Sequence, residues 1–424
     1  MAQLVAHHTG SVGVTGSNPV SSTGKENPVP LPAGDWNRVF LCHKSGHTTD
    51  LRTTATGGSF SLHLGDMTPA TPDNTDQINS IVVSKADSKA DSTADSTADS
   101  TAGEGQPEIT VTYTDTSAQP EFLGDGDLFI EVGWSSLNYK DAMALRGDKG
   151  VVRTWPLIPG IDAVGTVIES RNPRFARGDE VVVNGAGLGE NRHGGYTRRL
   201  WVDSEHTLHI PYNLSAQQVG ALGTAGYTAA LCVDALLQQG VTPGDGEILV
   251  TGSTGGVGSI ALHLLHQLGY TTVAVTGRRE EHADYLTGLG ASEIIDRAEL
   301  GEPGRPLQKA RWAGVVDSVG SHTLVNALAQ TQWGGIVTAC GLAQGPDLPA
   351  TVLPFILRGV HLVGINSVDA PRELRQRAWS LLSEYLDTGV LDAMTTVVEL
   401  ADVPQAGTDL MAGRLHGRTA VRIH

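Results

Sequence analysis

The sequence predicts an α/β fold in which a compact β-rich domain is joined to a doubly wound parallel-sheet domain. Three observations predict it. Short strand patterns separated by Gly and Pro turns dominate residues 128 to 225. From residue 226, apolar strands alternate with helical patterns. The first of these strands runs straight into a glycine-rich turn at residues 252–258.

Composition limits the possible class of protein. The 424 residues are 40% hydrophobic and 18% charged, which suffices for a large core. A formal net charge of -17 argues against a nucleic-acid partner, because phosphate binding needs a basic face. No uninterrupted apolar run approaches the roughly 18 residues needed to cross a bilayer, and the N-terminus lacks a signal pattern. We therefore expect a cytoplasmic protein without a membrane partner.

The first part of the chain offers little to fold. Residues 1–76 are rich in Gly, Ser, Thr, Asn and Pro, so we expect a disordered extension. Within residues 86–106, Ala-Asp-Ser recurs every four residues and forms no apolar face. Strand patterns at 78–83 and 109–113 flank this tract. The tract is thus expected to be an insertion in a β-hairpin loop, with an interdomain linker as the alternative.

Strand and helix patterns divide the rest of the chain. Residues 77–225 should form the β-rich domain, with strands at 128–132, 163–169 and 180–184. Residues 226–354 should form the parallel sheet, with strands at 247–251, 271–276, 293–296, 314–319 and 336–340. Residues 355–424 are expected to return to the first domain, with a helix near 371–388 and a last strand ending near Val421.

The glycine-rich turn predicts a dinucleotide site. It reads Gly252-Ser253-Thr254-Gly255-Gly256-Val257-Gly258, and the apolar residues after it have helical spacing. Glycines allow the backbone to approach a pyrophosphate, and a helix N-terminus presents free N–H groups to it. Because the motif lies between a strand and a helix, it is far more specific than a glycine pattern alone. A purely structural turn is the alternative reading.

The end of the next strand indicates which dinucleotide binds. NAD enzymes usually carry an acidic residue there, whereas this chain reads Thr276-Gly277-Arg278-Arg279. A guanidinium matches a 2′-phosphate, so NADPH is favoured over NADH. Arg279 is interpreted as a solvated charge at the start of a helix.

These residues and the segments around them, over about residues 78–424, resemble the medium-chain dehydrogenase/reductases, and within them the quinone-oxidoreductase-like acrylyl-CoA reductase family. The resemblance implies a GroES-like β-barrel domain and a Rossmann domain with the active site between them. It also suggests a homodimer. The matching segments are 135–141, 159–162, 183–185, 194–196, 223–229, 340–342 and 353–360.

The resemblance also bears on metal chemistry. Zinc alcohol dehydrogenases of this superfamily carry Gly-His-Glu where this chain has Gly160-Ile161-Asp162, so the ligating histidine is replaced. The three cysteines, Cys42, Cys232 and Cys340, are isolated and too few for the ligand sets of zinc. We expect no catalytic metal, which suits reduction of an activated C=C bond better than oxidation of an alcohol.

The family's cofactor contacts map onto residues of this chain. The resemblance places Tyr139 beside the nicotinamide and the turn residues against the pyrophosphate, with Thr276, Gly277 and Arg278 around the 2′-phosphate. The full set of implied cofactor contacts is Tyr139, Thr254, Gly255, Gly256, Val257, Gly258, Thr276, Gly277, Arg278, Arg297, Leu342, Ile356 and Ser367.

Candidate catalytic groups come from the same motif. The Tyr139 hydroxyl is a candidate proton donor or oxyanion partner, the alternative being cofactor packing. Asn138 is expected either to orient the substrate carbonyl or to cap the following helix. Lys140 and Asp141 are interpreted as a charge pair at the start of that helix.

The implied reaction is NADPH-dependent reduction of acrylyl-CoA to propanoyl-CoA. A quinone or another enone as acceptor is the alternative, and a non-catalytic NADPH-binding protein is a third reading. The basic side chains at 146, 149 and 153 are candidates to meet CoA phosphates.

Overall fold

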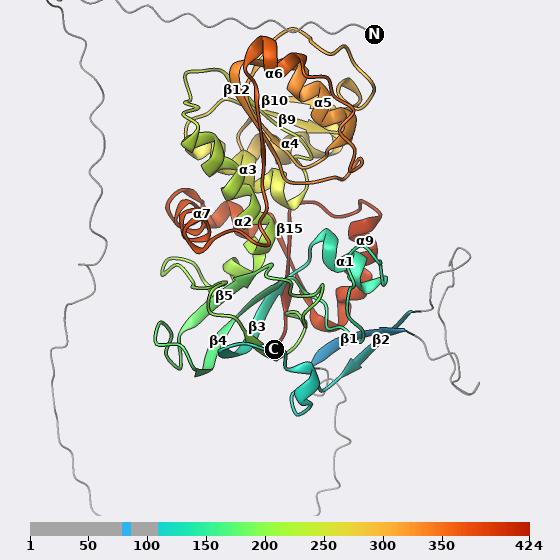
Figure 1. The fold of residues 1–424 in the computed structure, drawn as a ribbon, viewed down its shortest axis with the longest axis vertical. Coiled ribbons are helices and arrows are strands. Elements are labelled where there is room, and N and C mark those ends of the chain that lie inside the picture. The colour runs from blue at the N-terminus through green and yellow to red at the C-terminus, as the bar shows by residue number, and fades with distance from the viewer. Residues whose placement is uncertain (1–78, 86–108) are drawn as a thin grey trace, which may run out of the picture. The chain divides into compact units, whose positions relative to one another are not determined.

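The computed structural model describes residues 79–85 and 109–424. The predicted extension at 1–76 and the tract at 86–106 lie outside the described residues. Three sheets organise the described part (Figure 1). The smallest pairs β1 (Ser80–Lys85) with β2 (Ile109–Thr114) in antiparallel register, as the alternating patterns predict for a hairpin.

A six-stranded parallel sheet forms the predicted doubly wound domain. Its strands are β8 (Glu247–Val250), β9 (Thr272–Thr276), β10 (Ala291–Asp296), β11 (Trp312–Asp317), β12 (Thr331–Ala339) and β13 (His361–Gly364). The spatial order is β10-β9-β8-β11-β12-β13, with every neighbouring pair parallel. The order reverses between β8 and β11, which opens the binding crevice at their carboxyl ends. The associated helices are α3 (Gly256–Gln267), α4 (Arg279–Gly288), α5 (Ser321–Gln330) and α6 (Leu353–Arg358).

The strand β13 shifts one predicted boundary. We expected the parallel-sheet domain to end at residue 354, but β13 pairs with β12 and extends the sheet to Gly364. The pattern at 361–364 is too short and too exposed to be recognised as a strand without its neighbour.

A seven-stranded sheet forms the β-rich domain. The strands are β14 (Thr395–Glu399), β15 (Arg418–Arg422), β3 (Leu128–Ser136), β4 (Asp162–Ser170), β5 (Glu180–Asn184) and β7 (Thr207–His209), in that order, with β6 (Arg199–Val202) paired to β3. β14 and β15 come from the C-terminal region, so the chain returns to this sheet after the parallel one. Four helices accompany it, namely α1 (Tyr139–Leu145), α7 (Arg372–Tyr385), α8 (Thr388–Ala393) and α9 (Val403–Met411).

A long helix, α2 (Ala216–Gln238), crosses the predicted domain boundary at 225/226. Gly223 interrupts it with φ 48°, and a methyl group there would lie 2.6 Å from Oδ2 of Asp162. The kink thus brings the helix backbone close to a buried carboxylate. α2 is long and apolar enough to span a bilayer, contrary to our expectation, but 89% of the relevant window is buried in the structure. This burial is typical of a core helix.

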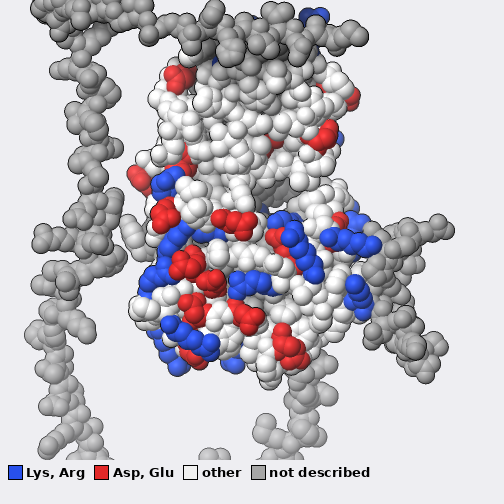
Figure 2. Space-filling view, viewed as in Figure 1, with Lys and Arg blue, Asp and Glu red and all other residues white. Residues whose placement is uncertain are grey.

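The predicted fold class is confirmed: a β-rich sheet domain is joined to a doubly wound parallel-sheet domain. Figure 2 adds the charge distribution on one face. There, blue and red side chains mix over the lower part of the described structure, while the upper part is mostly uncharged.

Candidate active site

The glycine turn is held tightly at the end of β8. Gly252 adopts φ 59°, and the Ser253 hydroxyl donates to the Val250 carbonyl (2.7 Å) while accepting from the Val275 N–H (2.9 Å). A methyl group on Gly258 would lie 2.7 Å from Cα of Ser253. The close packing of α3 on the turn therefore requires glycine at 258. α3 begins at Gly256, so its free N–H groups face the crevice end of the sheet.

Two arginines, Arg278 and Arg297, lie just after the ends of β9 and β10. The strands are in parallel register, with Thr276 beside Asp296, so the residues that follow them are neighbours. The Arg297 guanidinium lies directly against Gly277, where a methyl group would overlap its Nε. Arg278 is half-buried and faces Glu281, with Nη1 and Oε1 3.6 Å apart. The structure thus places Arg297 against Gly277, the residue directly before Arg278.

The remaining predicted contacts are less closely grouped. Leu342 follows β12 and is 63% exposed, and its Cα lies 3.3 Å from the position of a Cβ on Gly320, which follows β11. Leu342 therefore borders the crevice. Ile356 lies on α6 and is 68% exposed. Ser367 follows β13, and its carbonyl accepts from Arg375 (3.4 Å). Neither Ile356 nor Ser367 hydrogen-bonds to the glycine turn in the described structure.

The side chains of residues 138–141 lie partly at the surface and partly in the interior. Tyr139, the first residue of α1, is 51% exposed, so its hydroxyl is available to a ligand. Our interpretation of Lys140 and Asp141 as a charge pair is wrong. Lys140 forms an ion pair with Glu190 (2.7 Å), whereas Asp141 is fully buried and accepts N–H groups from Asn138 and Ile161 (both 2.8 Å).

The second buried carboxylate, Asp162, is the centre of a polar cluster, and five donors converge on it. Oδ1 accepts from the Asn184 amide (2.7 Å) and the Thr224 hydroxyl (2.6 Å). Oδ2 accepts from the Thr224 N–H (2.8 Å), the Asn138 amide (2.8 Å) and the Ser136 hydroxyl. Protein donors thus fully satisfy a carboxylate that has no exposed surface.

Asn138 belongs to this cluster rather than to the solvent-facing site. Its amide nitrogen carries two hydrogens and lies within hydrogen-bond distance of Ser136, Asp141 and Asp162 (2.8, 3.1 and 2.8 Å). The amide therefore has no hydrogen left for a substrate carbonyl. Residues 137–138, which join β3 to α1, are here called the active-site loop, and Asn138 connects this loop to the buried carboxylates.

The pKa of Asp141 is raised to about 7. Burial is the main cause, and the negative charge of Asp162 adds to it; together they outweigh the hydrogen bonds from Ile161 and Asn138. The ordinary value is 3.8, so between pH 3.8 and about 7 the folded state binds more protons than the unfolded state. The contribution of Asp141 to stability is therefore present at low pH and is lost as pH rises through this window.

We expect the free energy of unfolding to fall by about 1 kcal/mol per pH unit from pH 5 to 7 because of this one group. The measurement is urea unfolding at pH 5, 6, 7 and 8 for the wild type and Asp141→Asn. The difference between the two slopes isolates Asp141 from other titrating groups. Equal slopes for both proteins would contradict the prediction.

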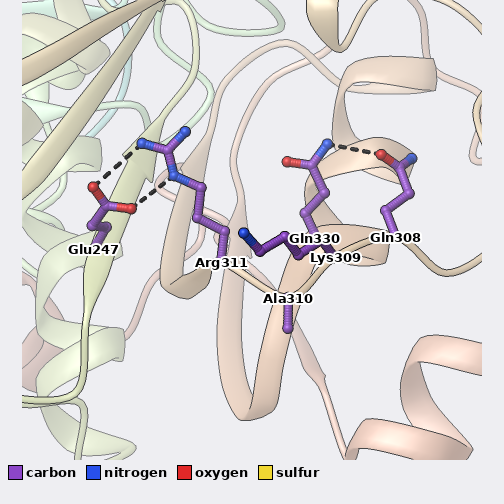
Figure 3. Close-up of a pocket in the computed structure, with 6 residues that line it drawn as sticks. All are labelled: Glu247, Gln308, Lys309, Ala310, Arg311 and Gln330. Atoms are coloured by element: carbon purple, nitrogen blue, oxygen red, sulfur yellow. Dashed lines mark hydrogen bonds and ion pairs between the residues drawn. The ribbon is translucent and has the colours of Figure 1, made fainter.

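A pocket of about 470 Å³ lies away from this site (Figure 3). Arg311 lies at its edge and donates to Glu247 (2.7 Å). Glu247 begins β8 and Arg311 precedes β11, so the pocket lies at the amino ends of the strands, opposite the crevice end. We do not assign it to the dinucleotide. Its lining consists of Glu247, Gln308, Lys309, Ala310, Arg311 and Gln330.

Sequence reasoning overlooked part of the site. In the sequence, Asp162 is recognisable only as the residue after Ile161, which replaces the zinc ligand, and Arg418 belongs to none of the predicted motifs. Arg418 is 3% exposed, and its Nη2 lies 3.5 Å from Oδ1 of Asn138. The sequence feature that could have indicated both residues is a polar side chain at the end of an apolar strand pattern.

Two family models match the chain. One, described as an alcohol dehydrogenase GroES-like domain, covers residues 124–229, and the other, described as a zinc-binding dehydrogenase, covers residues 256–384. Among residues 79–85 and 109–424, no group of three or more His, Cys, Asp or Glu side chains is suited to a metal ion.

Known proteins also resemble the chain closely. A probable acrylyl-CoA reductase of Escherichia coli is 46% identical over 321 residues, which span 76% of this chain and 97% of that protein. The structure of a Salmonella enterica oxidoreductase in complex with NADP has a TM-score of 0.72 and 44% identity, over 76% of this chain and 98% of that one. A Bacillus subtilis protein with NAD bound has a TM-score of 0.71 and 39% identity, over 81% of this chain and 98% of that one.

Proposed function

Because the chain belongs to the acrylyl-CoA reductase family of the medium-chain dehydrogenase/reductases, we propose that it reduces acrylyl-CoA, or a closely related short 2-enoyl-CoA, to the saturated thioester with NADPH. The observation that carries the choice of coenzyme is the pair of guanidinium groups at Arg278 and Arg297. Two similar solved structures, with 44% and 45% identity, contain NADP or NADPH, in agreement with this choice, while one with 39% identity contains NAD.

The residues present fit NADPH. The turn from Thr254 to Gly258 and the N-terminus of α3 would hold the pyrophosphate, and Arg278 and Arg297 would hold the 2′-phosphate. Tyr139 and Leu342 offer exposed surface at the crevice for the nicotinamide half. When bound, NADPH supplies the hydride that adds to the β-carbon of the enoyl thioester.

The chain's own chemical task is to position the acceptor and to stabilise negative charge on the thioester oxygen. The Tyr139 hydroxyl suits this task because it is the exposed donor of the motif, while Asn138 is held by the buried cluster. The Asp162 cluster holds Asn138, the residue directly before Tyr139, and so fixes the start of α1. The Tyr139→Phe variant tests this role of the hydroxyl.

A steady-state comparison of acceptors tests the function. With NADPH fixed at saturation, kcat/KM should be higher for acrylyl-CoA than for a benzoquinone, since the proposed acceptor is a thioester. Enoyl-CoA substrates of three to eight carbons would then define the chain-length preference. A higher kcat/KM for the quinone would replace the proposal by a quinone oxidoreductase. NADPH binding without turnover of any acceptor would indicate a non-catalytic protein.

Three basic side chains after α1 are proposed to meet the CoA phosphates. Arg146, Lys149 and Arg153 are all exposed and form no ion pair with any described residue. Replacing all three by alanine should raise KM for acrylyl-CoA by about tenfold, because three exposed charge contacts each contribute less than about 1 kcal/mol. Steady-state kinetics would measure it, with NADPH binding unchanged.

The matched control removes the same charge elsewhere on the surface. Arg171, Arg174 and Arg177 are also exposed, in the turn after β4. Their triple alanine variant should leave KM for acrylyl-CoA close to the wild-type value. An unchanged KM in the first triple variant, or equal effects in both, would contradict a CoA site at residues 146–153.

We further propose a cytoplasmic homodimer with no nucleic-acid or membrane partner. The family resemblance suggests the dimer, and the edge strand β13 leaves one side of the parallel sheet unpaired in the described structure. Sedimentation equilibrium would test it through the molar mass in solution.

A further inference from the structure

Arg418 is a buried cation without an ion pair among the described residues. It begins β15 and is 3% exposed. Burial lowers the pKa of its guanidinium, while the charges of Asp162 and Asp141 oppose that shift. Its Nε donates to the carbonyl of Ala221 (2.6 Å). Burying a guanidinium is costly unless its geometry is well satisfied, so its contacts call for an explanation.

Those contacts join two parts of the proposed site. On one side, Nη2 faces Oδ1 of Asn138 (3.5 Å), the residue directly before Tyr139. On the other side, Nη1 lies at the first residue of α3, because a methyl group on Gly256 would overlap it. The preceding residue continues this contact, since the Gly417 N–H donates to the Thr254 carbonyl (2.9 Å). One side chain thus touches both the active-site loop and the coenzyme turn.

Gly256 therefore has a second reason to be glycine. Its Cβ would meet Arg418 on one side and lie 3.1 Å from Cβ of Ala225 on the other. Close approach to a pyrophosphate is the usual reason for this glycine. Here the space beside it is also occupied by the guanidinium, so a methyl group at 256 would displace Arg418 from Asn138.

We propose that Arg418 is a positioning residue that transmits binding at the coenzyme turn to the active-site loop, which leads directly into Tyr139 at the start of α1. The proposal rests on the proposed function for its meaning in catalysis. Arg418 keeps the N-terminus of α3 and Asn138 in one fixed relation, and occupation of the turn therefore orders the loop. Lysine cannot reproduce this, because it has no planar fork with which to serve Ala221, Asn138 and the turn together.

The test compares Arg418→Lys, Gly256→Ala and the double variant. Amide hydrogen exchange of the peptide covering residues 136–142 is measured with and without NADPH, and NADPH affinity is measured by fluorescence titration. In the wild type, NADPH should slow exchange in this peptide about tenfold. Arg418→Lys should still bind NADPH within about threefold of wild type but lose this protection. Gly256→Ala also alters the coenzyme turn, so its affinity for NADPH should fall; its exchange is measured at saturating NADPH, where the protection should likewise be lost. Arg422→Met, on the same strand in an exposed ion pair with Glu399, is the control and should behave as wild type.

Kinetics supply the second readout, with the acceptor that the wild type turns over fastest. Each single variant should lower kcat at saturating NADPH by about tenfold, and the double variant should be no slower than the slower single one, because both changes remove the same contact. Multiplicative effects, or retained protection in Arg418→Lys, would overturn the proposal. So would an Arg418→Lys protein that no longer folds, since the role would then be purely structural. The hydrogen-exchange test of Arg418 does not require turnover, so it gives a result even if the protein reduces neither acrylyl-CoA nor a benzoquinone. The proposal for Arg418 and the proposed function can therefore fail separately.

Discussion

Replacing Arg278 and Arg297 together by alanine is expected to raise KM for NADPH at least 100-fold and to leave KM for NADH within about threefold. Hydrogen bonds to charged groups contribute about 1.5–3 kcal/mol each, so the loss of two guanidinium partners costs the 2′-phosphate about 3–6 kcal/mol. NADH lacks this phosphate and should be insensitive. Initial rates of the wild type and the double variant, measured with each coenzyme at a fixed acceptor concentration, give the four KM values.

The neighbouring Arg279 provides the matched control. It is exposed at the first position of α4, and we interpreted it from the sequence as a solvated charge. Arg279→Ala should therefore change KM for NADPH less than threefold. If the double variant weakened NADPH and NADH equally, the two arginines would be supporting the fold of this region rather than the 2′-phosphate.

Asp162→Ala is expected to lower the free energy of unfolding by about 3–5 kcal/mol. The change leaves five donors, two of them buried and three part-buried, without their acceptor, and uncompensated buried polar groups are among the most destabilising features of a core. Urea unfolding followed by circular dichroism at pH 8, where Asp141 is mostly ionised, would measure the loss.

A carboxylate in an exposed turn is the control for this change. Asp245 accepts two hydrogen bonds from Thr242 (2.7 and 2.9 Å) in an exposed turn. Asp245→Ala should cost less than about 1 kcal/mol because water replaces the lost partner. A loss below 1 kcal/mol for Asp162→Ala as well would show that the buried cluster can rearrange or hydrate.

Much of the architecture was predictable because its signals are local. The strand patterns at 163–169 and 180–184 and the turn at 252–258 are periodicities and glycine positions within about ten residues, and the structure places strands and the turn there. Two elements were not predicted because their signals are not local. β13 is recognisable only through its pairing with β12, and the predicted domain boundary at 225/226 falls inside α2, just after its kink at Gly223.

The site divides in the same way. The sequence alone determined the glycine turn and Arg278, since strand-turn-helix order and the residue after the next strand follow from chain order. Only the tertiary structure decided how Asp162 and Arg418 are used. Their partners lie far along the chain, Asn138 and Arg418 being 280 positions apart, and a polar residue gives no sign of which distant group will satisfy it. Burial makes that choice, because inside the protein each such group must find its partner or lose stability.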